Sequence, residues 1–439
     1  MSEPLTPAEL LAKRQQYMAP TLAHYYERPM NLVRGEMQHL FDSDGRRYLD
    51  FFAGICTVSV GHSNPQVNQR VIDQIGRLQH TSTVFLTEPM VNLAERLAQI
   101  TPGRLQMSIM TNSGTEANET AVLLAKRFTG RNEIVALKHA YHGRSWLAAS
   151  LTAIASYRVD PVPVPGISFA ENPYCYRCPY GKVPSACALE CAKDVENVIK
   201  TQTTGAPATF VAETMQGVGG IITPPPDYFK VVREITQRHG MVFHIDEVQA
   251  GFGRTGRWFG IEHYGVEPDI ITMAKGMGNG FAIGGCITTP EIAESLKAGT
   301  INTFGGNPIS ATASLATIDY IEQAHLMAQA RELGDYLLDA LRGLQEEFPL
   351  IGDVRGKGLM LGVELVEDPR SKLPALVETK RVLELMKDDG VIVGRGGLHG
   401  NVLRLQPPMV ITRGDCDRLV TSMRRAIATV SEQLASKTG

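Results

Sequence analysis

Short apolar runs alternate with helical or loop stretches between residues 105 and 290. The runs are apolar at nearly every position, which is typical of strands buried on both faces of a parallel sheet. We predict strands at 107–111, 133–138, 209–213, 241–246, 269–274 and 284–289. The pattern therefore indicates an α/β fold, with a mainly parallel central sheet and helices on both of its faces.

The pattern changes after residue 308. A long helix is predicted from about 308 to 347, and another near 375–389. Short strands are expected at 358–366, 391–393 and 401–406. A last helix begins after the capping residue Thr412. Its apolar face comprises Leu419, Val420, Met423, Ile427, Val430 and Leu434. This part of the chain is expected to form a smaller α+β domain.

The N-terminal segment carries its own start and turn signals. Thr6, Pro7 and Glu9 have the chemistry of a capped helix start, and this helix should end near residue 17. Residues 38–52 indicate a hairpin with its turn at 42–45. Asn64 and Pro65 should begin another helix. Its apolar stripe comprises Val67, Val71, Ile75 and Leu78.

Three parts of the chain follow from these patterns. Residues 1–60 are expected to contribute a helix and a hairpin that join the small domain. Residues 61–330 should form the large domain, and residues 331–439 the small C-terminal domain.

Composition excludes some classes of partner. The 439-residue chain has 43 basic and 46 acidic side chains, a net charge of −3 and 43% hydrophobic residues. Its basic residues form no stripe, so neither nucleic acid nor a membrane surface is an expected partner. No apolar run approaches the roughly 18 residues of a spanning helix, and the N-terminus lacks a basic region followed by an apolar one. We expect a cytoplasmic protein.

Lys275 is the first candidate for chemistry. It directly follows the predicted strand 269–274 and precedes Gly276, Gly278 and Gly280. A lysine in this place is solvated, paired with an acid, or held neutral by burial. Only the neutral amine condenses with a carbonyl cofactor. Taken alone, an ordinary solvated or paired lysine is the simpler explanation.

Upstream residues favour the neutral amine. Ser113, Gly114 and Thr115 precede a predicted helix, where free N–H groups and the helix dipole favour a phosphate, although a plain cap also explains them. Asp246 ends strand 241–246, at the edge where open α/β sheets bind ligands. A buried Asp there keeps a pyridine nitrogen protonated. A turn cap is the commoner role of a single strand-end Asp.

An aromatic residue adds to this set. Tyr141 and His142 follow the strand that ends at Lys138, and the tyrosine ring could stack on a flat cofactor or form a surface turn. Asp246 lies 29 residues before Lys275, with the phosphate site still earlier. This combination is far rarer by chance than any one of its members.

Five motifs occur in a fixed order along the chain. They are SGTEAN (113–118), AYHG (140–143), DEVQAGFGRTG (246–256), AKGMGNG (274–280) and NTFGGNP (302–308). With them the chain resembles the class III aminotransferases, which are pyridoxal 5'-phosphate enzymes of fold type I. The resemblance runs from about residue 35 to the C-terminus. It is closest to the branch with mitochondrial-type alanine:glyoxylate aminotransferase and ω-amino-acid:pyruvate transaminases.

The resemblance implies roles for individual residues around the cofactor. Lys275 would form a Schiff base with it, and Asp246 would pair with its ring nitrogen. Val248 would pack on the ring face opposite Tyr141, and Gln249 would reach the phenolic oxygen. The implied cofactor-binding set is Ser113, Gly114, Thr115, Tyr141, His142, Asp246, Val248, Gln249, Lys275 and Thr303. Since Thr303 is implied to reach the phosphate of a neighbouring subunit, a homodimer or homotetramer is expected.

The substrate side is also implied by the resemblance. Arg404 matches an arginine that clamps a substrate carboxylate, although a strand arginine is otherwise usually a surface ion pair. Glu213 matches a glutamate that pairs with this arginine when no α-carboxylate is present, but Thr214 stands where the family often has proline. Ile55, Cys56 and Thr57 follow the hairpin, where family members often line the substrate pocket, as Tyr141 does from the cofactor side.

The implied reaction is a transamination. An amino acid, ω-amino acid or amine gives its amino group to a 2-oxo acid such as pyruvate or glyoxylate, through the Schiff base and pyridoxamine phosphate. Racemases, epimerases and decarboxylases on the same scaffold share the lysine and the aspartate, so they stay open alternatives. A non-catalytic module would lack both residues. A dinucleotide oxidoreductase would need G-x-G-x-x-G where this chain has NSGTEAN.

Four of the seven cysteines lie close together in the sequence. Cys175, Cys178, Cys187 and Cys191 fall within 17 residues, a spacing compatible with zinc or an iron–sulfur cluster. The second pair also has the pattern of a helix start, and free cysteines pack as small hydrophobes. We expect thiols here in preference to a metal site.

Overall fold

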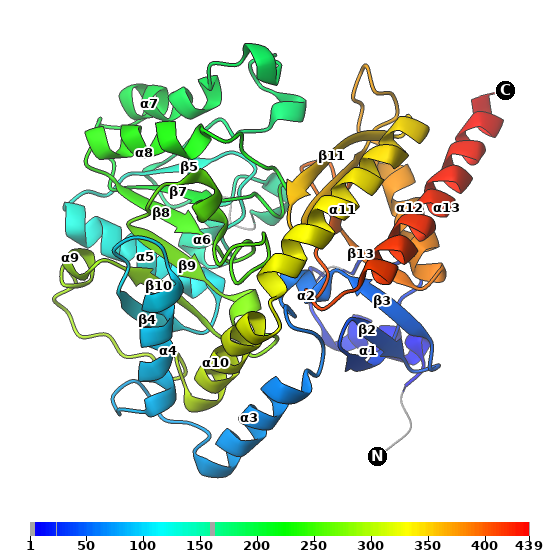
Figure 1. The fold of residues 1–439 in the computed structure, drawn as a ribbon. Coiled ribbons are helices and arrows are strands. Elements are labelled where there is room, and N and C mark those ends of the chain that lie inside the picture. Colours follow the sequence, from blue (N-terminus) through cyan, green and yellow to red (C-terminus); the bar gives the residue numbers. More distant parts are fainter. Residues whose placement is uncertain (1–4, 23, 159–162, 439) are drawn as a thin grey trace.

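The computed structural model describes residues 5–22, 24–158 and 163–438, and these residues form two lobes with one sheet each (Figure 1). The sheet of the larger lobe has the order β4-β10-β9-β8-β7-β5-β6. Its strands are β4 Met107–Thr111, β5 Ile134–Leu137, β6 Ile167–Ala170, β7 Thr209–Glu213, β8 Val242–Asp246, β9 Ile270–Met273 and β10 Gly284–Thr288.

The strand directions agree with the predicted α/β class. From β6 to β9 every neighbouring pair is parallel, whereas β10 runs antiparallel to both β4 and β9. All six predicted strands of this sheet are present. The apolar pattern misses β6, because this four-residue edge strand is mostly only half-buried.

Helices cover both faces of the large sheet. α5 (Gly114–Thr129) shares a core cluster with Val242 and Ile270, on one face. α7 (Glu190–Gln202) and α8 (Tyr228–Arg238) pack on the other, in one cluster with Phe243. Neighbouring residues of β8 thus face different helices, because successive side chains of a strand point to opposite faces. This two-sided burial explains the nearly continuous apolar runs.

The second sheet combines the two ends of the chain. Its order is β1-β2-β3-β13-β14-β12-β11. The strands are β1 Leu32–Glu36, β2 His39–Asp42, β3 Arg47–Phe51, β11 Ile351–Lys357, β12 Met360–Leu365, β13 Val391–Gly396 and β14 Val402–Leu405. The predicted hairpin is present as β2 and β3, and β3 joins the C-terminal strands by parallel pairing with β13. β1 and β11 were not predicted, since glycines and charged residues interrupt their apolar pattern.

The capped helices begin where the sequence predicts. Thr6 and Glu9 form a reciprocal capping box at α1 (Pro7–Tyr17). The Asn64 side chain accepts from Gln66 N and Val67 N at α3 (Pro65–Arg77). The predicted stripe of α3 is wrong in its second half. Val67 and Val71 are buried, but Ile75 and Leu78 are 42% and 45% exposed, because α10 covers only part of this helix within the chain.

The long helix predicted from 308 to 347 is broken. α10 (Pro308–Gln323) and α11 (Leu326–Glu347) are separate helices, and His325 between them has φ 52°. A left-handed residue cannot continue a right-handed helix, and an isolated polar residue does not reveal this from sequence. The last helix, α13 (Arg413–Thr438), begins after Thr412 as predicted, and it buries Leu419, Met423 and Ile427.

Five further α-helices and five short 3-10 helices complete the described elements. The remaining α-helices are α2 Ala53–Cys56, α4 Glu88–Ile100, α6 Trp146–Leu151, α9 Pro290–Ala293 and α12 Leu376–Asp388. Short 3-10 helices are η1 Ala155–Tyr157, η2 Cys175–Arg177, η3 Pro184–Ala186, η4 Gly260–Tyr264 and η5 Lys275–Met277. Among the described helices, none has both the length and the apolar character needed to span a bilayer.

Candidate active site

A cavity of about 420 Å³ lies at the carboxyl ends of the central parallel strands. Ten residues predicted from the sequence line it. They are Ser113, Gly114, Thr115, Tyr141, His142, Glu213, Asp246, Val248, Gln249 and Lys275. Parallel strands bring their carboxyl ends to one edge, so residues far apart in the chain meet there.

Lys275 lies two residues beyond the end of β9, in η5. Its φ is 45°, an unusual value for a residue with a side chain, and such backbone strain concentrates at functional sites. Burial lowers the pKa of its amine from the ordinary value, and the charge of Asp246 opposes that shift. The amine is thereby moved towards the neutral form that a carbonyl group requires.

Asp246 is fully enclosed at the end of β8. Its Oδ2 is 2.7 Å from His142 Nδ1 and 2.8 Å from Asn118 Nδ2, and its Oδ1 accepts from Val248 N at 3.0 Å. Burial alone would raise the pKa of this carboxyl, but the hydrogen bond and charge of His142 hold it below the ordinary range. Asp246 therefore keeps its negative charge beside the cavity.

A second layer of polar residues fixes Asn118. Thr272 Oγ1 donates to Asn118 Oδ1 at 2.7 Å, and His244 Nε2 lies 3.2 Å from the same hydroxyl. Burial lowers the pKa of His244 to about 3, so this imidazole is neutral. Asn118, Thr272 and His244 were not predicted as site residues from the sequence. Asn118 is part of the SGTEAN motif, and this motif is the signal from which it could have been found.

The expected phosphate site lies at the N-terminus of α5. Ser113 is the N-cap and accepts from Glu116 N at 3.3 Å. A Cβ on Gly114 would be 3.0 Å from Val248, so a glycine lets the helix approach the cavity closely. The hydroxyl of Thr115 accepts from Arg144 N and Ser145 N, at 3.1 and 3.2 Å. Thr115 thus holds the 143–145 loop against the N-terminus of α5.

Tyr141 and Glu213 are linked through the backbone. Glu213 Oε1 accepts from Tyr141 N at 2.9 Å, and its Oε2 accepts from Gly217 N at 2.9 Å. The ion pairs of the described residues include none between Glu213 and Arg404, so the structure does not bring this expected pair together. Burial raises the pKa of Glu213 to about 7, and the charge of Asp246 adds to the shift.

Arg404 lies on β14 of the second sheet, behind the cavity wall. Its Nη2 donates to Gln249 Oε1 at 2.7 Å and to Gln406 Oε1 at 2.8 Å, while its buried Nε has no partner among the described residues. Gln249 therefore faces the cavity and the arginine at once. Gln406 was not predicted as a site residue, because its role depends on Arg404 lying beside it in the folded protein.

The three residues predicted to line the pocket after the hairpin take different positions in the structure. Ile55 is 43% exposed and does not line the cavity. Cys56 is buried behind the wall, with its Sγ 3.3 Å from Gln249 O, and Thr57 is the residue that lines the cavity. Four successive positive φ angles, at residues 53–56, turn the side chains away from an ordinary helical order.

Thr303 is exposed in the loop before α10 and does not line the cavity of its own chain. The loop nevertheless reaches the cavity rim, because Asn302 Oδ1 accepts from Asn112 Nδ2 at 3.3 Å and Asn112 lines the cavity.

The cysteine insert lies away from the cavity. Cys175 is exposed in η2, Cys178 and Cys187 are half-buried, and Cys191 is buried in α7; all four are free. The second pair thus marks the start of a helix, as expected. Within the described ranges, no three His, Cys, Asp or Glu residues are arranged to hold a metal ion.

A parallel sheet with a buried lysine and an ionised carboxylate at one edge defines an enzyme that uses a carbonyl cofactor. Residues 21–427 match the family model of the class-III aminotransferases, and the chain belongs to that family. It is a pyridoxal-phosphate-dependent transaminase.

Known relatives match nearly the whole chain. The chain is 45% identical over 415 residues to alanine–glyoxylate aminotransferase 2 homolog 2, mitochondrial, of Arabidopsis thaliana, covering 94% of this chain and 86% of the relative. It is 38% identical to a leucine/methionine racemase of Thermococcus litoralis, covering 97% and 96%. An amine transaminase from an uncultivated Pseudomonas species, solved in its PLP-bound form, superimposes with a TM-score of 0.87 at 30% identity, covering 94% and 98%.

The raised pKa of Glu213 predicts how stability depends on pH. The ordinary value is 4.5 and the folded value about 7, so the folded protein binds an extra proton between these values. The free energy of unfolding of the cofactor-free protein should therefore fall as pH rises through this window, and Glu213→Gln should remove up to about 3 kcal/mol of that fall. Urea unfolding at pH 5, 6, 7 and 8 measures it.

Glu262→Gln is the matched control, because Glu262 also accepts a backbone N–H, from Phe259 at 2.8 Å, but lies away from the cavity. It should leave the pH profile of the parent protein unchanged. A Glu213→Gln profile as steep as that of the parent would contradict the prediction.

Proposed function

We propose that this transaminase exchanges amino groups between a small amino acid such as alanine and a short 2-oxo acid such as glyoxylate or pyruvate. The observation that carries the proposal is the meeting of Lys275 and Asp246 at one cavity, with Arg404 behind its wall. The names of relatives such as the Arabidopsis aminotransferase support the same substrate class.

The cavity fits pyridoxal phosphate in its donor set. The free N–H groups at the start of α5 would hold the phosphate. Val248 and Tyr141 would enclose the ring, and Gln249 would reach its phenolic oxygen. Asp246, kept ionised by His142, would hold a proton on the ring nitrogen. When bound, the cofactor supplies an aldehyde that condenses with amines and a ring that accepts electrons.

Lys275 would hold the cofactor and then move the proton of the reacting carbon. Burial lowers its pKa, which brings the amine closer to the range where a base both accepts and returns a proton at neutral pH. Tyr141, held through its backbone by Glu213, would exclude water from the reacting side. Glu213 ends β7, Lys275 begins η5, and Tyr141 is bonded to Glu213 through its backbone, so these groups are held in place before substrate enters.

Arg404 would bind the substrate carboxylate. It is 2% exposed, and its guanidinium is bonded only to neutral amides of Gln249 and Gln406 among the described side chains. A buried cation without a carboxylate partner favours an incoming anion, and the planar fork suits two carboxylate oxygens. Glu213 would act through Tyr141, which is a different task from the one the family resemblance implies.

A racemase is the second candidate function, because a leucine/methionine racemase matches 97% of the chain. Both reactions need the same lysine and the same buried aspartate. They differ in whether an oxo acid receives the amino group.

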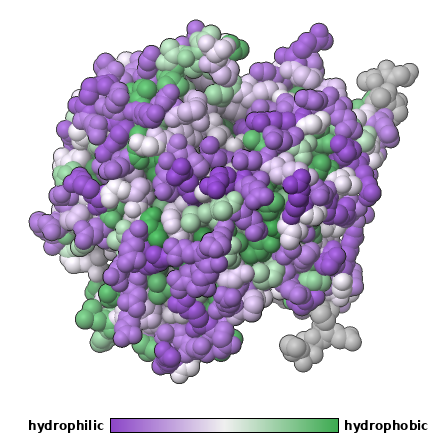
Figure 2. Space-filling view, in the orientation of Figure 1, coloured by the Kyte–Doolittle hydropathy of each residue, from purple (hydrophilic) through white to green (hydrophobic). Residues whose placement is uncertain are grey.

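We also propose that the chain works as a homodimer or homotetramer. Leu86, Ile301 and Phe304 are 92%, 73% and 60% exposed. Thr83 bonds to Asn302, which places these apolar side chains beside Thr303. Figure 2 shows apolar atoms at the lower left edge, over the segment that joins α3 and α4. Exposed apolar surface of this kind is typical of an interface, and Thr303 would then reach the partner's phosphate site.

The domain boundaries and the cellular location are part of the same proposal. We propose residues 61–330 as the large cofactor-binding domain, with 331–439 and 1–60 forming the small one. All seven cysteines are free, which supports a reducing compartment such as the cytoplasm. Fractionation of the source cells would show whether the protein is located in the cytoplasm or in an organelle.

Lys275→Ala should lower turnover by at least about 10³-fold, since both covalent attachment and proton transfer are lost. Borohydride followed by peptide mapping should fix the cofactor to Lys275 in the parent protein. Lys138→Ala is the matched control, because Lys138 also follows a parallel strand but pairs with Glu171 outside the cavity. Full turnover in Lys275→Ala would refute the assignment.

With L-alanine as donor, glyoxylate and carbon-labelled pyruvate should exceed 2-oxoglutarate by about tenfold or more in kcat/KM, and the label distinguishes the alanine formed from pyruvate from the alanine supplied. The second carboxylate of 2-oxoglutarate would have to be buried near Glu213 and the rings of Tyr141 and Tyr157, which costs desolvation. Product analysis with each acceptor measures this. Loss of optical purity of the donor, with no oxo acid aminated, would replace the transaminase by the racemase.

Leu86→Glu should shift the assembled protein towards the monomer and lower activity with it, because a charge would be buried in the interface. Light scattering across a dilution series measures the shift. Val377→Glu is the control, since Val377 is 72% exposed on α12 of the other lobe. A protein that stays monomeric and fully active in its parent form would rule out the shared site.

A further inference from the structure

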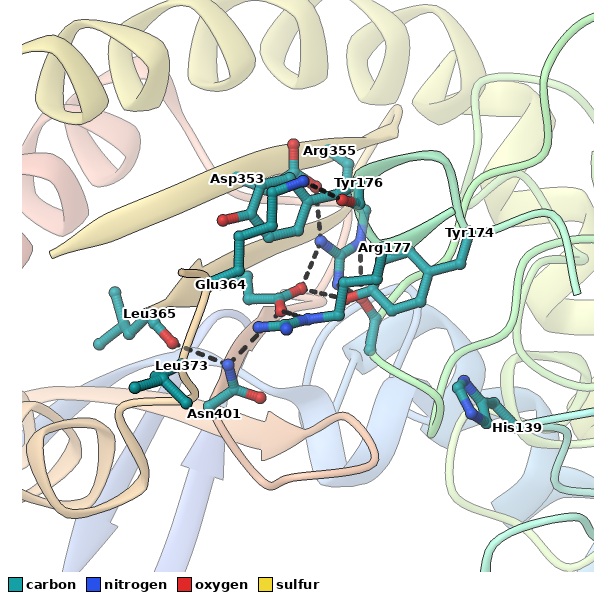
Figure 3. Close-up of polar contacts among 12 residues, drawn as sticks. His139, Tyr174, Tyr176, Arg177, Asp353, Arg355, Glu364, Leu365, Leu373 and Asn401 are labelled. Atoms are coloured by element: carbon teal, nitrogen blue, oxygen red, sulfur yellow. Dashed lines mark hydrogen bonds and ion pairs between the residues drawn. The ribbon is translucent and has the colours of Figure 1, made fainter. Parts of the chain in front are cut away.

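A buried carboxylate joins the two lobes beside the cavity. Glu364 lies on β12 and is 0% exposed. The segment that follows β6 crosses to it from the large lobe: Arg177 Nε donates to Glu364 Oε1 at 2.6 Å, and the Tyr174 hydroxyl donates to Oε2. Figure 3 shows Tyr174, Arg177 and Arg355 pointing toward this one carboxylate.

The contacts among Tyr174, Arg177, Asp353, Arg355 and Glu364 form a junction between the lobes, and the charges of this junction balance. Arg355 Nη1 is 2.9 Å from Glu364 and 2.6 Å from Asp353, so two guanidinium groups face two carboxylates. Burial alone would raise the pKa of Glu364, but the charge of Arg355, the Tyr174 hydrogen bond and the charge of Arg177 lower it. A buried carboxylate with its partners in place has one favoured geometry, and loss of a partner is costly.

One end of the junction leads to Arg404. β12 pairs with β14, with Gly362 opposite Arg404 and Glu364 opposite Val402. Glu364 is therefore two residues along the strand from the position that faces Arg404. A shift of β12 at Glu364 is transmitted directly to the strand that carries the arginine.

The other end leads to Tyr141. The ring of Tyr174 meets the imidazole of His139 edge-on, with centroids 6.4 Å apart. Asn172 Nδ2 donates to Gln216 Oε1 at 2.9 Å and lies 3.1 Å from His139 Nδ1. His139 has φ 60° and precedes Tyr141 by two residues. The segment bonded to Glu364 is thus packed on the loop that carries Tyr141.

We propose that Glu364 is a positioning residue of the transaminase: through Tyr174 and Arg177 it sets the separation between Arg404 and the Tyr141 side of the cavity. The inference rests on Arg404 as the carboxylate-binding residue of the proposed function. A substrate held at its carboxylate by one lobe and at its reacting carbon by the other binds tightly only when the two lobes keep one spacing.

Arg177→Met and Tyr174→Phe test the junction while Arg355 still neutralises Glu364. Each should raise the KM for L-alanine and for pyruvate by about tenfold, with a smaller change in kcat and an unchanged absorbance spectrum of the bound cofactor. Arg177→Lys keeps the charge and should recover part of the KM. The measurements are steady-state kinetics and absorbance of the holoenzyme.

Asp269→Asn is the matched control for a merely structural loss. It breaks the Arg233–Asp269 pair, whose side chains are 18% and 19% exposed, at the opposite edge of the large sheet. It should lower the melting temperature and leave both KM values within twofold of the parent. Equal KM values in Arg177→Met, Tyr174→Phe and the parent would overturn the inference, and so would an equal KM rise in the control.

Arg404→Leu separates this inference from the proposed function. If it leaves the KM for L-alanine unchanged, Arg404 does not bind the carboxylate and the inference falls with that role. If it raises that KM and the two junction variants do not, the proposed role of Arg404 stands and the role of Glu364 alone is wrong.

Discussion

The buried carboxylate of Asp246 is the constraint around which the large sheet is organised. A charge without water is tolerated only when fixed partners replace the water. Here His142, Asn118 and the backbone of Val248 supply them, from segments on both sides of the strand. Asn118 is in turn held by Thr272, which lies on β9, the strand that ends before Lys275. The position of the lysine and the charge of the aspartate therefore depend on one network.

Burial acts in opposite directions on the ionisable groups that share this cavity. It lowers the pKa of Lys275 and raises that of Glu213, so each is moved towards its neutral form. Asp246 is enclosed as fully, but His142 keeps it charged. One buried site thus holds a carboxylate that stays charged (Asp246), an amine of lowered pKa (Lys275) and a carboxyl whose pKa lies near neutrality (Glu213). Separate environments for similar groups are what acid–base chemistry at a cofactor requires.

Backbone strain is also present at this site. Positive φ angles occur at Lys275, at His139 before Tyr141, and at Ile55 and Cys56 beside Thr57. Each costs free energy that the surrounding packing must offset. The two lobes meet at this site, because Gln249 of the large lobe accepts hydrogen bonds from Arg404 and Gln406 of the small lobe.

The sequence by itself determined the class of the fold, the capped helix starts and ten of the residues that line the cavity. Apolar runs, caps at Thr6, Asn64 and Thr412, and strand-end positions of Asp246 and Lys275 are local signals, readable within a few residues. The tertiary structure alone decided which partner each polar group takes. Asn118 and Asp246 are 128 residues apart, Glu213 bonds to backbone where an arginine was expected, and of the predicted Ile55, Cys56 and Thr57 only Thr57 lines the cavity. A hydrogen bond forms with whichever group packing brings within 3 Å or so, and that choice depends on segments whose distance in the sequence carries no signal of their contact.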